Sequence, residues 1–309
     1  MSLPVVLGTR GSALALAQTR LVADALGGAA RIEVIRTAGD ASTRPFAELG
    51  DGVFVTALED ALRGGSIDAA VHSLKDLPTG PRPGLVVAAL LPRADPRDVL
   101  ITRDRSGLPG LVPNARVGTS SPRRDAALRA LRPDIVTSPI RGNVETRLEK
   151  IARGDYDATV LALAGLRRLG LAVGEAEVLD LGVMLPAPGQ GAIAVQCRAD
   201  DAYARAALAR VDDAATRRAT DAERELLRLL GGSCDLALGA LARADGPQIV
   251  LDAALDARRA RSRRGAADRP RRGARRTAWL VARERSAHRR PPRRGGAGGR
   301  RCRIGRSSC

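Results

Sequence analysis

Apolar and polar residues alternate in blocks along the first 255 residues, and these blocks predict strands and helices in turn. Short apolar runs that fit strands lie at residues 5–10, 31–37, 67–71 and 85–91. Amphipathic stretches that fit helices lie at residues 13–26 and 54–63, with Ser12 at the N-cap of the first and paired glycines after both. This alternation predicts an α/β domain with a largely parallel sheet.

A second set of strands and helices follows Pro92 and Pro96. The strands are predicted at residues 99–102, 116–118, 135–136 and 159–163, and the helices at 122–131 and 144–153. Residues 185–191 are rich in proline and glycine and indicate a hinge. The apolar run at 192–197 then predicts a strand that returns to the first domain.

The region that starts near Ala214 predicts a third, smaller domain. A helix is expected from residue 221 to 230, with Thr220 and Glu223 as a capping box at its start. Residues 248–255 fit a strand. Beyond this strand the sequence changes abruptly to arginine, glycine, alanine, proline and serine.

The net charge of +17 at first suggests a nucleic-acid-binding protein, but it is confined to the C-terminal tail. Residues 257–309 hold 20 Arg, no Lys and two acidic residues, a net charge of +18, so the rest carries −1. Aromatic residues make up 2% of the chain, too few for stacking on single-stranded nucleic acid. We favour a reading frame shifted near Asp256 as the origin of this tail, and the alternative is a disordered basic extension.

Other classes of protein are not supported by the sequence. No run approaches the ~20 consecutive apolar residues of a membrane span, and the N-terminus lacks the basic-then-apolar order of a secretory signal. The four cysteines are too scattered for a disulfide framework, and no spacing of Cys or His suggests a metal site. We therefore expect a cytoplasmic protein without a metal.

Arginines gather at the predicted starts of helices. Ser121 is a predicted N-cap with Arg123 and Arg124 in the turn that follows it, and Asn143 stands in the same way before Arg147. Cations at a helix N-terminus oppose the helix dipole, so this placement is unfavourable unless an anion binds there. A site for a polyanion would explain it, because guanidinium groups bind carboxylates in bidentate fashion. The alternative is that each arginine pairs with an acidic residue on the surface.

Lys75 and Asp76 come directly after a strand of the buried type, where α/β domains place their ligands. Asp76 is a candidate for steering protons or stabilising a cation, with an ordinary solvated ion pair as the alternative. His72 is a candidate general base, with a neutral structural histidine as the alternative. Cys234 follows a predicted helix end, which does not lower the pKa of a thiol. It is either a buried filler or, on a loop bounded by glycine, a point of attachment.

Six segments occur in the order found in one known family. They are GTRGS at residues 8–12, HSLKDLP at 72–78, GTSSPRR at 118–124, RGNV at 141–144, AGLRRLG at 164–170 and PGQG at 188–191. With these motifs in register from about residue 5 to residue 255, the chain resembles the porphobilinogen deaminase family.

The resemblance implies a fold and a division into domains. The fold class is α/β, with two periplasmic-binding-protein-like lobes and a smaller α+β C-terminal domain that carries the cofactor on a loop. Domain 1 would comprise residues 1–92 and 192–212, domain 2 residues 93–191, and domain 3 residues 213–256. Residues 257–309 would be an aberrant tail, disordered or frame-shifted.

The resemblance also implies an activity. Members of the family are transferases that deaminate and polymerise four porphobilinogen molecules head to tail into hydroxymethylbilane, in tetrapyrrole and haem biosynthesis. Their cofactor is a dipyrromethane primer, here joined by a thioether to Cys234. The expected partner is the substrate porphobilinogen, with no specific nucleic acid and no membrane, and the chain is expected to be a monomer.

The matching motif positions imply roles for individual residues. The catalytic residues would be Asp76, Lys75 and Arg10. Contacts with the cofactor would come from Cys234, Lys75, Ser73, Thr119, Ser121, Arg123, Arg124 and Asn143. Contacts with the substrate would come from Arg10, Ser12, Arg141, Arg147, Arg168 and Gln190. The carboxylate of Asp76 would stabilise positive charge during bond formation, and the arginines would hold the acetate and propionate groups of porphobilinogen.

The sequence departs from the family pattern at three places. Asp51 stands where a basic residue is usual, in a segment expected to be a mobile lid. Cys234 follows a serine where many relatives have glycine, although its distance to Gly239 is kept. The C-terminal domain gives way to the arginine-rich tail, which bears on the positioning of Cys234.

Other functions compete with this one. A non-catalytic two-lobed protein that binds an anionic ligand would explain the arginines, but not Lys75 and Asp76 beside a loop cysteine. A nucleic-acid-binding protein would explain the tail alone, and its salt-sensitive binding would disappear on deletion of residues 257–309. A third possibility is an inactive product of a frame-shifted deaminase gene.

Overall fold

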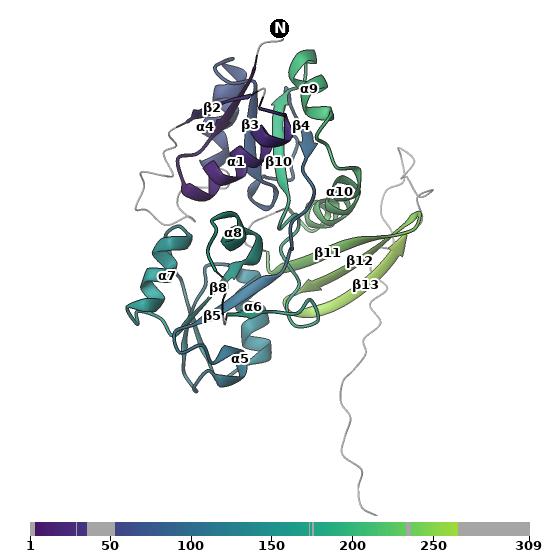
Figure 1. The fold of residues 1–309 in the computed structure, drawn as a ribbon. Helices are drawn as coiled ribbons and strands as arrows, with labels where there is room; N and C mark the ends of the chain where they lie inside the picture. The colour runs from purple at the N-terminus through teal and green to yellow at the C-terminus, as the bar shows by residue number, and fades with distance from the viewer. Residues whose placement is uncertain are drawn as a thin grey trace, which may run out of the picture.

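The chain folds around three β-sheets, which Figure 1 shows as two lobes, one above the other, with a smaller third unit beside their junction. This computed structural model describes residues 4–28, 30–35, 53–172, 174, 176–232 and 236–264. The predicted class, two α/β lobes with a smaller α+β domain, is confirmed. Asp51, in the segment expected to be a lid, and Cys234 lie outside the described residues.

The upper lobe contains a five-stranded sheet in the order β2-β1-β3-β10-β4. Its strands are β1 (Val5–Thr9), β2 (Ala30–Val34), β3 (Ala69–Ser73), β4 (Leu85–Leu90) and β10 (Ile193–Arg198). β1 pairs in parallel with β2 and β3, while β10 is antiparallel to both of its neighbours. Helices α1 (Ala13–Ala25), α4 (Val53–Arg63) and α9 (Ala202–Ala209) of this lobe contact the sheet. The prediction of a largely parallel sheet is confirmed, with β10 as the exception.

The lower lobe repeats this arrangement in the order β7-β6-β8-β5-β9. Its strands are β5 (Asp98–Thr102), β6 (Arg116–Gly118), β7 (Val136–Ser138), β8 (Ala158–Ala162) and β9 (Glu177–Val178). Its helices are α5 (Gly107–Gly110), α6 (Pro122–Leu131), α7 (Val144–Ala152) and α8 (Leu163–Arg168). Again the strand in the fourth place, β5, runs against the others. In both sheets the reversed strand is therefore the first one after the chain crosses between the lobes.

Side-chain caps fix the starts of three helices. The predicted N-caps Ser12, Ser121 and Asn143 each accept a hydrogen bond from a backbone N–H in the first turn of α1, α6 and α7, at 3.3, 3.5 and 2.8 Å. Pro122 occupies the first position of α6, where a helix needs no N–H donor. The three predicted helix starts are confirmed.

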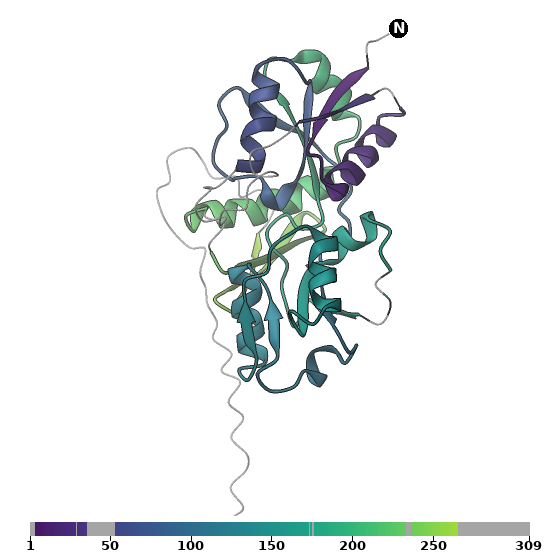
Figure 2. The same cartoon turned by 90° about the vertical axis from the view of Figure 1, so that its left-hand side faces the viewer.

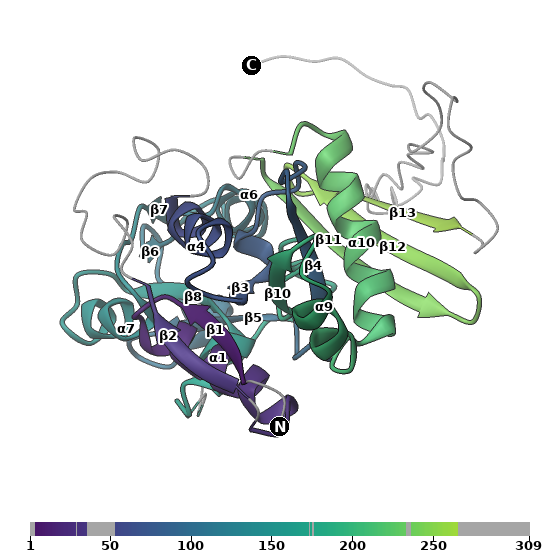
Figure 3. The same cartoon turned by 90° about the horizontal axis from the view of Figure 1, so that it is seen from above.

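The third unit places helix α10 (Ala214–Leu229) on a three-stranded antiparallel sheet, as Figure 3 shows. The strands are β11 (Leu238–Asp245), β12 (Gln248–Leu255) and β13 (Arg258–Arg264). Leu226 of the helix shares an apolar core with Leu238 and Leu251 of the sheet. β12 occupies the range that the sequence predicted.

The start of α10 differs from the sequence analysis. Asp213 is the N-cap, and its Oδ1 accepts a hydrogen bond from Thr216 N at 2.7 Å. Thr220 lies inside the helix, where its hydroxyl donates to Thr216 O at 2.9 Å. The predicted capping box of Thr220 and Glu223 is therefore wrong, because an earlier acidic cap starts the helix about two turns sooner.

Residues 258–264, which the sequence analysis assigned to the tail, form β13. Asp256 and Ala257 take positive φ angles of 46° and 64° and make a two-residue turn, after which every residue of β13 pairs with β12. The hydrogen bonds of a ladder join backbone groups, so the open edge of β12 accepts even an arginine-rich strand. The prediction that residues 257–309 form a disordered tail is therefore wrong for residues 258–264, which form a strand. Residues 265–309 lie outside the described ranges.

One buried carboxylate joins all three units. Glu223 of α10 is 0% exposed and accepts hydrogen bonds from Arg93 Nη1 at 2.6 Å and Nη2 at 3.1 Å. It also accepts hydrogen bonds from Gly189 N at 2.7 Å and from Ala242 N at 2.8 Å. Arg93 and Gly189 belong to the two segments that cross between the lobes, and Ala242 belongs to β11. α10 accordingly lies at the height of the junction between the lobes (Figure 2).

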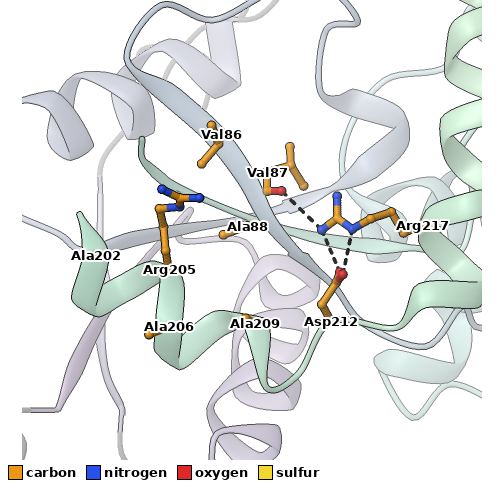
Figure 4. A pocket seen from close by; sticks show the side chains of 9 residues that line it. All are labelled: Val86, Val87, Ala88, Ala202, Arg205, Ala206, Ala209, Asp212 and Arg217. Carbon is orange, nitrogen blue, oxygen red and sulfur yellow. Dashed lines mark hydrogen bonds and ion pairs between the residues drawn. The ribbon is translucent and has the colours of Figure 1, made fainter. Parts of the chain in front are cut away.

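The outer edge of β4 is covered by side chains from the segment that leads into α10 and from α10 itself (Figure 4). Arg217 Nη2 donates to Val87 O at 3.3 Å, and Leu90 N donates to Asp212 Oδ1 at 2.8 Å. These contacts occupy backbone groups that an exposed edge strand leaves open to another chain. None of the described site residues expected from the sequence lines the hollow between β4 and α9.

Replacing Glu223 by glutamine should destabilise the protein strongly. The Arg93 guanidinium would stay buried without its counter-charge, which lowers the free energy of unfolding by about 3–5 kcal/mol for buried pairs. Glu225→Gln on the same helix is the matched control, because Glu225 is exposed and pairs with the exposed Arg228. Urea unfolding at neutral pH measures both variants, and equal stabilities would contradict the role assigned to Glu223.

Candidate functional site

β3 of the upper lobe delivers two of the three candidate catalytic residues. It runs into a short 3₁₀ turn, η1 (Leu74–Asp76). Leu74 is 1% exposed and donates its N–H to Ala192 O at 3.0 Å, which anchors the turn from the inside. Lys75 is half-buried and Asp76 is exposed. Both therefore stand at the carboxyl end of a strand whose neighbour β1 runs parallel to it, a position that favours ligand binding.

The two arginines at the start of α6 are buried and bind an internal carboxylate. Arg123 and Arg124 are 6% and 7% exposed, and Asp98, the first residue of β5, is 0% exposed. Arg123 Nη1 donates to Asp98 Oδ2 and Arg124 Nη2 donates to Asp98 Oδ1, each at 2.8 Å. The anion that offsets the two arginines at this helix start is therefore Asp98, a residue of the protein. The alternative that each arginine pairs with an acidic residue on the surface is wrong for these two.

Asp98 is a site residue that the sequence analysis missed. Burial by itself would raise the pKa of Asp98, but the two guanidinium groups outweigh it and hold the pKa well below its ordinary value. Its carboxylate cancels part of the positive charge of the arginines and also accepts a hydrogen bond from Gln190 Nε2 at 2.9 Å. The one signal in the sequence is an acidic residue directly before the apolar run at 99–102.

Three buried polar atoms beside Asp98 have no hydrogen-bond partner among the described residues. They are Nε of Arg123, Nε of Arg124 and Oε1 of Gln190. A buried polar group without a partner costs about 1–3 kcal/mol, so these three atoms offer unused hydrogen-bonding capacity to a bound molecule. A ligand that has both carboxylate oxygens and N–H groups would satisfy the two donors and the acceptor.

Charges from the two lobes act on one another at this site. Burial lowers the pKa of Lys75 below its ordinary value, while Asp76 raises it and Arg124 lowers it. Burial also lowers the pKa of Arg147 on α7, with a further lowering from Arg124 and an opposing effect from Asp76. Lys75 and Asp76 of the upper lobe and arginines of the lower lobe are therefore near enough to shift one another's pKa.

Several expected contact residues use polar atoms within the protein. Gln18 Nε2 donates to Ser73 Oγ at 2.8 Å, and Ser121 N donates to Thr119 Oγ1 at 3.2 Å. The oxygens of the three N-caps Ser12, Ser121 and Asn143 accept hydrogen bonds from their own helices. The hydroxyls of Ser12 and Ser121 keep an O–H donor for a ligand, since a hydroxyl both donates and accepts, whereas the hydroxyl of Ser73 donates to Gln18 Oε1 at 3.2 Å.

The remaining arginines come from both lobes. Arg168 Nη2 donates to Gly191 O at 2.6 Å, next to Gln190, and burial lowers the pKa of Arg168 to about 10. Arg10 is half-buried directly after β1, and Arg141 is half-buried just before α7. Within the described ranges, no helix has the length and apolar character of a membrane span, and no three His, Cys, Asp or Glu side chains are grouped as metal ligands.

His72 has the surroundings of a structural histidine. It is 6% exposed in β3, and burial lowers its pKa to about 4, while the neighbouring Gln196 side chain has a smaller opposite effect. Gln196 Nε2 donates in turn to the buried carboxylate of Glu59 at 3.1 Å. The geometry thus favours a neutral structural histidine over a general base.

Comparisons with known proteins agree on one family. The family model described as porphobilinogen deaminase, dipyromethane cofactor binding domain, matches residues 5–206. Porphobilinogen deaminase of Nocardia farcinica is 51% identical over 242 residues, covering 77% of this chain and 70% of that protein. That of Roseiflexus sp. is 47% identical over 272 residues, covering 86% and 90%. Among solved structures, a methionine-binding protein is 13% identical with a TM-score of 0.43, covering 74% of this chain and 96% of that one.

Replacing His72 by glutamine should remove part of the pH dependence of stability. His72 takes up a proton near pH 6.5 when unfolded but only at about 4 when folded, so the unfolded state binds more protons between these values. The free energy of unfolding of the wild type should therefore fall by on the order of 3 kcal/mol more than that of the variant when the pH drops from 7 to 4.

Urea unfolding at both pH values measures this difference. The other histidine of the chain, His288, is present in both proteins and cancels in the comparison. The same pH dependence in the two proteins would show that His72 titrates normally in the folded state.

Proposed function

The chain belongs to the porphobilinogen deaminase family, and from this premise we propose the roles of its individual residues. It is a hydroxymethylbilane synthase, a transferase of tetrapyrrole biosynthesis that deaminates four porphobilinogen molecules and joins them head to tail. One observation carries the assignment of roles: the charges of Lys75 and Asp76 on the upper lobe and of Arg124 and Arg147 on the lower lobe act on one another.

The buried arginines suit the charge of the substrate. Each porphobilinogen carries an acetate and a propionate, so the growing chain accumulates carboxylates. Arg123 and Arg124 supply positive charge in surroundings with little water, where charges interact strongly, and the half-buried Arg147 adds to it. Asp98 orients the guanidinium groups of Arg123 and Arg124 and offsets their charge before any ligand binds. Two buried cations need such a counter-charge, because burying an unpaired charge is costly. We assign contacts with the substrate to Arg10, Ser12, Arg141, Arg147, Arg168 and Gln190.

The dipyrromethane cofactor of this family fits the residues beside Asp98. Its carboxylates and pyrrole N–H groups match the unpartnered Nε atoms of Arg123 and Arg124 and Oε1 of Gln190. We assign its contacts to Lys75, Ser73, Thr119, Ser121, Arg123, Arg124 and Asn143, with a thioether to Cys234. When bound, the cofactor supplies the terminal pyrrole ring to which substrate units are added.

Asp76 acts on the substrate by charge and position. Loss of ammonia from the aminomethyl group of porphobilinogen leaves an electron-poor methylene carbon conjugated to the pyrrole nitrogen. A carboxylate held against the pyrrole N–H stabilises this cation, so Asp76 need not remove a proton itself. Lys75 and Arg10 serve the same step by holding the substrate's carboxylates beside Asp76. Hydrolysis after four additions releases the linear tetrapyrrole.

The division into domains follows the sheets. We place residues 1–92 with 192–212 in domain 1 and residues 93–191 in domain 2, because each of these sets contains one five-stranded sheet. Domain 3 starts at residue 213 and extends at least to residue 264, since β13 belongs to its sheet. The cytoplasmic location, the monomeric state and the absence of a nucleic-acid partner stay predictions from the sequence.

A non-catalytic anion-binding protein is the competing function. It would need the buried arginines and Asp98, but it has no use for an exposed carboxylate beside Lys75, because Asp76 would repel an anionic ligand. The position of Asp76 therefore favours the enzyme.

Asp76→Ala should lower the rate of tetrapyrrole formation at least ~100-fold, because the charge opposite the developing cation is lost. Asp155→Ala is the control, since Asp155 is exposed and pairs with the exposed Arg153. The rate is measured by the absorbance of the oxidised product, and the intact mass should show the primer in both variants. Normal turnover of the Asp76 variant would show that its assigned role is wrong.

Cys234→Ala should never acquire the primer. Under reducing conditions, the intact mass of the wild type should exceed its sequence mass by two linked pyrrole units, and the variant should have its sequence mass. Cys197→Ala is the matched control, because Cys197 is 0% exposed in the core of the upper lobe. A wild type that stays at its sequence mass after addition of porphobilinogen would indicate a family member that no longer works as a deaminase.

A further inference from the structure

Arg224 of α10 forms hydrogen bonds with the backbone of the upper lobe. Its partners lie at and just after η1, the turn that carries Lys75 and Asp76 and is called the catalytic turn below. Its Nη1 donates to Leu77 O at 2.7 Å and to Leu74 O at 3.2 Å. Its Nη2 donates to Pro78 O at 2.8 Å. In the part of the chain that the structure describes, all of its side-chain hydrogen bonds go to these three carbonyls.

The three carbonyls surround Lys75 and Asp76 along the chain. Leu74 O also accepts a hydrogen bond from Leu77 N at 3.1 Å, which closes the 3₁₀ turn. The Arg224 guanidinium therefore lies at the carboxyl end of the turn, where backbone carbonyls lack partners and positive charge is favourable. A planar guanidinium can serve three carbonyls at fixed angles, which an ammonium group cannot do in the same geometry.

The turn has few other supports. Leu74 and Leu77 are 1% and 4% exposed and anchor it toward the upper-lobe core, and Leu74 N binds Ala192 O at 3.0 Å. Asp76 is exposed, so its position is set by the backbone on either side of it. Arg224 binds that backbone from the third unit, so the turn is held both by the upper lobe and by α10.

The helix that carries Arg224 is itself fixed to the rest of the molecule. The preceding residue, Glu223, binds the two segments that cross between the lobes. Burial lowers the pKa of Arg224, and Asp221 one turn earlier opposes this effect. α10 ends at Leu229, and Cys234 follows ten residues after Arg224 along the chain. Two consecutive residues thus connect this helix to the lobe junction and to the catalytic turn.

We propose that Arg224 is a positioning residue, which fixes Asp76 relative to the helix that leads to the cofactor-attachment cysteine. The proposal rests on the function proposed above. Arg224 does not touch the reacting atoms, and it acts through the backbone of residues 74–78. A loss of Arg224 should therefore lower catalysis through misplacement of Asp76, while the arginines of the lower lobe still bind the substrate's carboxylates.

The test compares Arg224→Ala with two variants on the same helix. Arg228→Ala removes an exposed arginine one turn later, which pairs with Glu225. Leu226→Ala removes a core contact of α10 with the sheet of the third unit and so reports on loss of stability alone. Arg224→Lys keeps the charge without the planar fork. All are purified as full chains carrying the primer, as judged by intact mass.

The kinetic expectation is a split between kcat and KM. Arg224→Ala should lower kcat about 10- to 100-fold, the effect of displacing a catalytic group by roughly an ångström, with KM changed by less than about threefold. Arg224→Lys should restore only part of the rate. Arg228→Ala and Leu226→Ala should keep the kcat of the wild type at a temperature where all variants are folded.

A second readout does not depend on activity. Amide hydrogen exchange of the peptide that covers residues 74–79 should become faster in Arg224→Ala and stay unchanged in Arg228→Ala, because the hydrogen bond from Leu77 N to Leu74 O loses its support. If the alanine variant does not fold, the same measurements on Arg224→Lys decide the question.

The proposal is overturned if exchange at residues 74–79 is unchanged, or if Leu226→Ala lowers kcat as much as Arg224→Ala does. A rise in KM with unchanged kcat would make Arg224 a binding residue and would also overturn it. A wild type that forms no tetrapyrrole would refute the proposed function, whereas the exchange experiment would still test the contact itself.

Discussion

The arrangement of the three units depends on the burial of one carboxylate. An ionised side chain that is removed from water is stable only when strong donors replace the water, and Glu223 has four such hydrogen bonds. The donors come from both crossing segments and from the sheet of the third unit. They converge on Glu223 only when all three units are docked, so this carboxylate couples the position of α10 to the junction between the lobes.

The two crossing segments are tied to each other by the same means. Arg93 Nε donates to Gln190 O at 2.8 Å, and Gln190 Nε2 donates to Pro96 O at 2.7 Å. Gly191 has a φ of 91°, and a Cβ there would lie 2.5 Å from Ala94 O, so only glycine allows the segments to approach this closely. The two crossing segments are therefore hydrogen-bonded to each other where they connect the two lobes.

A second buried carboxylate organises the site in the lower lobe. Asp98 stands at the end of the first crossing segment and binds Arg123, Arg124 and Gln190. Its negative charge offsets the repulsion between the two arginines and the positive end of the helix dipole of α6. Nε of each arginine is buried and has no hydrogen-bond partner among the described residues. In the function proposed above, the arginines that contact the carboxylate-rich ligand are thus held in place before it binds, which lowers the cost of ordering on binding.

Short sequence patterns predicted correctly the helices and strands whose start or apolar run lies within a few residues. The helix at 122–131 and the strands at 116–118 and 248–255 have the predicted bounds, because a Ser-Pro start and short apolar runs act over a few residues. The same patterns failed at α10, where two possible caps compete and Asp213 prevails over Thr220. They also failed at β13, whose arginines carry no strand signal and whose pairing comes from the neighbouring strand β12.

The sequence by itself determined the alternation of strands and helices, the N-caps and the family, because these reside in short stretches of the chain whose meaning does not depend on what packs against them. Only the tertiary structure decided which acids and arginines meet. Asp98 lies 25 residues from Arg123, and Arg224 lies 147 residues from Leu77, so no local pattern could relate them. Burial makes these interactions strong, because charges attract each other strongly only where water is excluded. Water is excluded only when the units are packed against one another.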